Sequence, residues 1–149
     1  MSSLKNELKN GGSGRRLKPY QLSDGIRCYA LANRRGSRSF VDDWLDSPRS
    51  EEKARRLLST VLKISTNGLG WALGSRKIRR ISPQLYEIKN FSGATRVMAH
   101  IRVADSVVLL HPFQGHRGTG NIPASTVANA AQQQRLVVEL LEEEEYDGD

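Results

Sequence analysis

The sequence predicts an α+β domain of two layers, in which a twisted, mainly antiparallel sheet carries helices on one face. Three observations predict it. Apolar residues recur at helical spacing between residues 50 and 67, alternate with polar residues from Arg76 onward, and return to helical spacing after Pro123. The chain has 149 residues, of which 38% are hydrophobic and 26% charged, which is the size and composition of one globular domain.

The first half of the chain predicts one strand followed by an N-terminal α-hairpin. Residues 1–23 mix Lys, Asn, Ser and Gly with little apolar periodicity, and we expect a disordered basic extension. A strand is expected at Ile26–Ala32. We expect a short helix capped by Ser37 or Ser39, and a longer one that Ser50 caps and that Asn67-Gly68 ends.

The second half predicts a meander of strands and a terminal helix. The helix is expected to run from Pro123 to Leu141, and the acidic run after it opposes the helix dipole, so we expect that end to fray. The folded domain is therefore expected at 24–141, with an acidic tail at 142–149. The expected strands are Arg76–Ile81, Leu85–Phe91, Thr95–Val103 and Ser106–Phe113, and the last is apolar enough to lie in the sheet centre.

The charge of the chain is unevenly distributed. The net charge is +7, but seven of the 16 acidic residues lie in the last eleven positions, where no basic residue occurs. Residues 1–138 thus hold 23 basic and nine acidic side chains, a net charge of +14. A body this basic indicates a polyanionic partner, and nucleic acid is the partner we expect.

Several classes of protein are disfavoured by the composition. No apolar run is long enough to span a bilayer, and residues 1–18 contain no apolar signal core, so we expect a cytoplasmic protein without a membrane partner. Cys28 is the only cysteine, which favours a reducing compartment. Three scattered histidines and this cysteine do not form a zinc motif, so neither a metal nor another cofactor is expected.

The segment Leu85–Val103 holds the strongest catalytic candidates. A two-residue turn at Ser92-Gly93 would pair Lys89 with Arg96 and Glu87 with Met98. Like charges directly opposite each other destabilise a hairpin, which indicates a bound anion such as phosphate. The two faces are expected to hold Tyr86, Ile88, Val97, Ala99 and Ile101 on the core side, and Glu87, Lys89, Arg96, His100 and Arg102 on the other.

Metal-free RNA cleavage requires a base, a cation at the phosphate and an acid. Lys89 is the candidate base because a neighbouring cation disfavours a protonated amine, and Arg96 is the candidate phosphate ligand. His116, in the loop after the last strand, is the candidate acid. The further RNA contacts that we expect are Arg76, Lys77, Arg79, Arg80, Arg102 and Arg117.

Each candidate also has a purely structural interpretation. Lys89 and Arg96 are equally compatible with a solvated polar face, and His116 with an ordinary loop residue. His100 shares the predicted face of Arg96 but lies deeper in the sheet. His111 is expected to be a hydrogen-bonded core histidine.

Five segments, taken in order, resemble the RelE/HigB-like superfamily of toxins from toxin–antitoxin systems, in its phage-derived branch. Gly36–Ser47 is similar to the family pattern G-x-S-P-V-x-E-F-L-D-S, and the helix ending at Asn67-Gly68 to L-L-x-x-x-G. The three other segments are Leu85–Lys89, similar to L-Y-E-L-R, Arg96–Met98, similar to R-V-L-Y, and Val107–Phe113, similar to I-V-L-L-H-G-F.

This resemblance implies a RelE-like, microbial-RNase-like fold and metal-independent cleavage of mRNA in the ribosomal A site. It implies contact with ribosomal RNA and neutralisation by a cognate antitoxin protein. By position, Lys89 and Arg96 match basic residues of the family's catalytic face, and His116 and Arg117 match its basic segment after the last strand.

Two non-catalytic alternatives remain open. Related folds include toxins that act on DNA gyrase, and a phage-type member could instead inhibit a host protein. The loop Gln114–Gly118 lacks the lysines that relatives carry after the phenylalanine, which keeps open an inactive, RNA-binding regulator.

Overall fold

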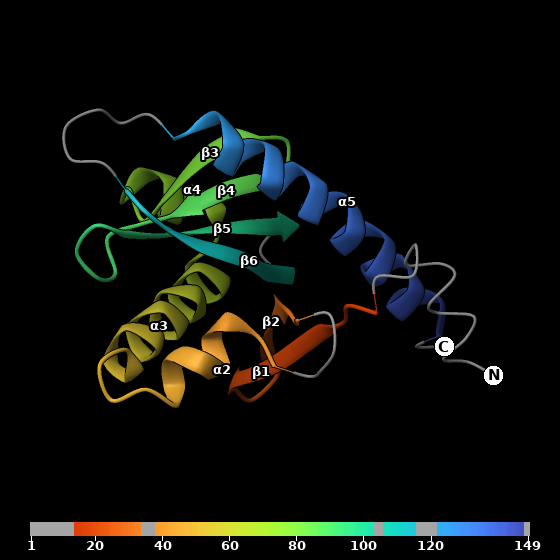
Figure 1. The fold of residues 1–149 in the computed structure, drawn as a ribbon, viewed down its shortest axis with the longest axis horizontal. Helices are drawn as coiled ribbons and strands as arrows, with labels where there is room; N and C mark the ends of the chain where they lie inside the picture. Colours follow the sequence, from red (N-terminus) through yellow and green to blue (C-terminus); the bar gives the residue numbers. More distant parts are fainter. Residues whose placement is uncertain (1–13, 34–37, 103–105, 116–121, 148–149) are drawn as a thin grey trace.

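The computed structural model describes residues 14–33, 38–102, 106–115 and 122–147 (Figure 1). Its strands are β1 (Leu17–Ser23), β2 (Ile26–Leu31), β3 (Ile78–Ser82), β4 (Leu85–Ile88), β5 (Thr95–Arg102) and β6 (Ser106–Gln114). Its helices are α2 (Phe40–Leu45), α3 (Glu51–Asn67), α4 (Leu69–Gly74) and α5 (Ala124–Asp147).

The strands form one sheet in the order β1-β2-β6-β5-β4-β3. Neighbouring strands are antiparallel except β2 and β6, which run parallel with Tyr29 opposite Val108. The α+β class, the mainly antiparallel sheet and the meander from β3 to β6 are therefore confirmed. The parallel contact arises because three helices and the β3–β5 meander intervene before β6 returns beside β2.

The N-terminal extension contains a strand that the sequence analysis missed. Leu17–Ser23 pairs with β2, with Tyr20 opposite Cys28 and Leu17 opposite Leu31. The prediction of disorder is wrong for these residues, because Tyr20 and Leu22 pack against one core and Leu17 against the other. Residues 1–13 lie outside the described residues.

A polar network fixes β1 to the start of α2. Ser39 is the N-cap, and its backbone N–H donates to Asp42 Oδ2 at 2.9 Å in a capping box. Lys18 Nζ lies 2.9 Å from the same carboxylate oxygen, and the Tyr20 hydroxyl bonds the Ser39 hydroxyl. Burial raises the pKa of Asp42, but the Ser39 N–H, Lys18 and Tyr20 outweigh it and hold the pKa below its ordinary value.

The helices lie on both faces of the sheet, not on one. The stripe of α3, with Ala54, Leu57, Val61 and Ile64 buried, packs on the first core together with α2 and α4. On the opposite face α5 packs Ala130, Val137, Leu140 and Leu141 against β4, β5 and β6 (Figure 1). The two-layer expectation is wrong because the apolar run of β6 needs cover on both sides.

The helix ends differ from expectation in detail. Helix α3 begins after Ser50, whose side chain makes no capping hydrogen bond, and ends at Gly68 with φ +92°. Helix α4 was not predicted, because its six residues carry too little periodicity to be recognised. Helix α5 continues to Asp147, past the expected end at Leu141.

Candidate nucleic-acid interface

Three cations form a row across one end of the sheet. Lys77 immediately precedes β3 and Lys89 immediately follows β4; the Lys89 N–H donates to the Lys77 carbonyl at 2.9 Å, continuing the register of Ile78 with Ile88. The ladder of β4 with β5 ends at Ile88 and Val97, and Lys89 and Arg96 are the next residue on each side of that last pair. The row therefore runs Lys77, Lys89, Arg96 on the face that also bears α5.

Arg96 is held in place by the backbone around it. Its Nη1 donates to the carbonyls of Gly93 at 3.0 Å and Thr95 at 3.1 Å. Gly115 lies against its stem, and a Cβ added there would meet Arg96 Cγ at 3.2 Å and Nε at 3.3 Å. The absence of a side chain at Gly115 thus leaves the space that Arg96 occupies.

The hairpin turn is longer than predicted. Glu87 pairs with Met98 as expected, but the ladder stops at Ile88–Val97, so Lys89 and Arg96 are not a ladder pair. Asn90 has φ +63° and donates from Nδ2 to the Arg76 carbonyl at 2.6 Å, while the Thr95 N–H donates to Ser92 O at 3.0 Å. The Asn90 hydrogen bond draws the loop toward β3 and away from a two-residue turn.

The cations of the row are not paired with a carboxylate in the described structure, since Glu87, on the same face, is paired with Arg79. Lys77, Lys89 and Arg96 form no ion pair with another residue in the described part of the chain. Like charges that lie near one another on neighbouring strands destabilise a sheet. A bound polyanion removes this repulsion, so the row suits a phosphate group.

The other predicted RNA contacts are dispersed. Arg79 forms an ion pair with buried Glu87, with Nε 3.3 Å from Oε1, and this pair links β3 to β4. Arg76 and Arg80 are exposed, but Arg80 lies opposite Tyr86 and so projects from the other face. Arg102 is at the far end of β5, about 20 Å from Arg96 by the rise of a strand. His116 and Arg117 lie outside the described residues.

His100 and His111, which lie on the sheet, form hydrogen bonds with glutamines of α5. His100 is 1% exposed and its Nδ1 lies 3.0 Å from Gln134 Nε2, which also donates to Pro83 O. His111 Nδ1 bonds Oε1 of the adjacent Gln133. Burial lowers the pKa of His100, and the charge of Arg102 lowers it further. His111 is hydrogen-bonded as expected, but it is half-buried and not part of the core, whereas His100 is buried.

Three further features of the described residues bear on metal binding, on thiol chemistry and on membrane crossing. No three His, Cys, Asp or Glu side chains among them are grouped to hold a metal ion. Burial raises the pKa of Cys28 to about 12, which makes this thiol a poor nucleophile. In the same residues, no helix combines the length and the apolar character that a membrane crossing needs.

Two features of the site were missed in the sequence. Lys77 was expected only as a backbone contact, because its place beside Lys89 depends on how β3 pairs with β4. Gly115 appeared as one glycine of a loop, and no local signal marks its contact with Arg96. The glutamines that form hydrogen bonds with His100 and His111 could likewise not be identified from the sequence, because their contacts depend on which face of the sheet α5 covers.

Comparisons with protein-family models, with curated proteins and with solved structures found no match to this chain.

Proposed function

We propose that this protein is a metal-independent endoribonuclease of the toxin–antitoxin type, which cuts translated mRNA in the ribosomal A site. The observation that carries the proposal is the row of Lys77, Lys89 and Arg96, which has no acidic partner in the described structure. The resemblance to RelE/HigB-like toxins supports the same reaction, and with it a RelE-like fold and an antitoxin partner.

The reaction needs no group beyond side chains of this kind. The ribose 2′-oxygen attacks the adjacent phosphorus, the bond from phosphorus to the 5′-oxygen breaks, and the products are a 2′,3′-cyclic phosphate and a 5′-hydroxyl. The proton of the 2′-hydroxyl passes to a base, and the leaving oxygen receives one from an acid. The pentacoordinate phosphate gains negative charge in between, and cations stabilise it.

The three cations have distinct parts in this proposal. Arg96 contacts the non-bridging phosphate oxygens through its planar guanidinium, whose orientation the Gly93 and Thr95 carbonyls maintain. Lys89, as the free amine, accepts the 2′-hydroxyl proton, and Lys77 adds positive charge at the phosphate. His116, which follows Gly115 in the sequence, remains the proposed acid because an imidazole can give and take a proton near neutral pH.

The test is inducible expression in a bacterial host, with primer extension on an abundant translated mRNA. We expect new 5′ ends within the reading frame only while translation proceeds, and none with Arg96→Ala or Lys89→Ala. The matched control is Arg56→Ala, which removes a cation on α3 that is paired with Glu52. Growth arrest without new 5′ ends, or ends that persist in Arg96→Ala, would contradict the proposal and favour a gyrase-type or other binding protein.

A further inference from the structure

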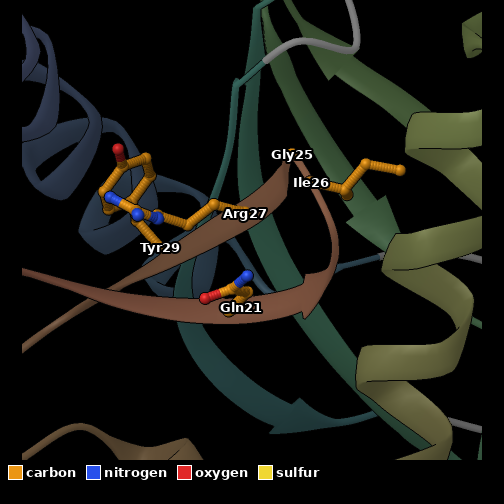
Figure 2. A pocket seen from close by; sticks show the side chains of 5 residues that line it. All are labelled: Gln21, Gly25, Ile26, Arg27 and Tyr29. Atoms are coloured by element: carbon orange, nitrogen blue, oxygen red, sulfur yellow. The ribbon is translucent and has the colours of Figure 1, made fainter.

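A pocket lies at the end of the sheet remote from Arg96. Its volume is about 230 Å³, and it is lined by Gln21, Gly25, Ile26, Arg27 and Tyr29. Figure 2 shows the Arg27 and Tyr29 side chains leaving β2 on the same side, with Gln21 on the neighbouring strand. Gln21 and Arg27 are register partners, so their side chains flank the same position of the ladder.

The polar groups of this pocket have no partner within the described structure. Arg27 and Gln21 are exposed, and neither forms an ion pair or a hydrogen bond through its side chain with another described residue. Tyr29 is half-buried: it packs against the core beneath α5 and also lines the pocket. The pocket therefore offers a guanidinium, an amide and an aromatic ring to a ligand.

A second arginine, Arg102, lies on the same face of the sheet as Arg27 and lines a separate pocket together with Glu142 of α5. The parallel register of Tyr29 with Val108 places Arg27 level with Ser106, and Ser106 pairs with Arg102. Two arginines thus lie two strand spacings apart, about 10 Å, on the same face. The Ser106 hydroxyl between them is enclosed and has no hydrogen-bond partner among the described residues.

We propose that Gln21, Arg27 and Tyr29 form a second contact for single-stranded RNA, separate from the cleavage site. The Tyr29 ring stacks on an unpaired base, Arg27 binds a neighbouring phosphate, and the Gln21 amide bonds a base edge or ribose. An aromatic ring beside a planar amide suits a base better than an acidic peptide, which needs cations alone. The inference rests on the proposed function for the identity of the substrate. The second contact would lie about 20 Å from Arg96 along the strand direction.

The experiment measures binding of the full-length protein to a fluorescein-labelled, single-stranded RNA with 2′-O-methyl riboses, which cannot be cut by 2′-oxygen attack. We expect Arg27→Ala and Tyr29→Leu each to weaken binding about tenfold, and Tyr29→Phe to leave it unchanged because the ring remains. Arg27→Ala should also reduce the slope of log affinity against log salt by about 0.7. Arg55→Ala, which removes a paired cation of α3, is the control and should bind as wild type.

Melting temperatures confirm that the variants are folded before binding is compared. Wild-type affinity in folded Arg27→Ala and Tyr29→Leu would overturn the inference. Displacement of the RNA by polyglutamate, with no dependence on Tyr29, would also overturn it in favour of an acidic protein partner. Because the probe cannot be cleaved, loss of binding in these variants supports the contact even if the wild type proves not to be a nuclease.

Discussion

Asp42 joins the first strand to the rest of the domain, and its removal should be measurable. The carboxylate accepts the Ser39 N–H and pairs with Lys18, both at 2.9 Å, and its side chain is 11% exposed. Loss of the capping-box bond costs about 1 kcal/mol. Loss of the partly exposed ion pair with Lys18, together with the Ser39 N–H left without an acceptor, costs about another 1 kcal/mol. Asp42→Ala should therefore lower the free energy of unfolding by about 2 kcal/mol, and the melting temperature by roughly 6–8 °C.

The assay is thermal and urea denaturation followed by circular dichroism, with Asp43→Ala as the matched control. Asp43 is the next residue of α2, but it is exposed and its partner Arg38 also contacts Asp46, so its removal should cost less than about 0.5 kcal/mol. Because the pKa of Asp42 is lowered, its contribution is complete above the ordinary value of 3.8 and is lost as the pH falls through the lower folded-state value. Equal stability of the two variants at pH 7 would refute this reasoning.

Three further predictions concern the cleavage site and α5. Gly115→Ala should reduce RNA cleavage on the order of tenfold by displacing Arg96, whereas Gly74→Ala, where an added Cβ meets nothing, should not; equal activities would exclude the contact. His100 has a lowered pKa, so its contribution to stability is present above the unfolded-state pKa near 6.5 and is lost as the pH falls through the folded-state value. In urea titrations at pH 7.5 and pH 5, the free energy of unfolding of the wild type should fall toward that of His100→Asn at the lower pH. The same difference in unfolding free energy between the two proteins at both pH values would contradict this. Met98→Ala, fully buried beneath α5, should cost about 3 kcal/mol in the same assay, against less than about 0.5 for exposed Leu73→Ala.

Local patterns predicted the parts of the fold that depend on local alternation. The face shared by Tyr86, Ile88, Val97, Ala99 and Ile101 is buried as expected, because side chains of a strand alternate whatever its neighbours are. Strand β1 was missed because a Gly- and Ser-rich start dominated the composition of residues 1–23. The side of the sheet that α5 covers was also missed, because it depends on tertiary packing.

The candidate site was predictable only in part. Lys89 and Arg96 lie on the expected face of the sheet. Side chains alternate between the two faces along a strand, so the face of each residue follows from its neighbours Ile88 and Val97. The pairing of Arg79 with Glu87 and the place of Lys77 beside Lys89 required the register of β3 with β4. The sequence places Arg102 and Arg96 on one face of a strand, but Arg102 lies six residues further along β5.

The most direct test of the central claim is a cleavage assay on purified ribosomes. The ribosomes hold a defined mRNA with a known codon in the A site, and the protein is added as a metal-free preparation. We expect one cut, which yields a 2′,3′-cyclic phosphate and a 5′-hydroxyl. We also expect that a single 2′-deoxyribose at the scissile nucleotide abolishes the cut, and that Arg96→Ala does so too. Cleavage of the 2′-deoxy message, or products with a 5′-phosphate, would contradict the proposed chemistry.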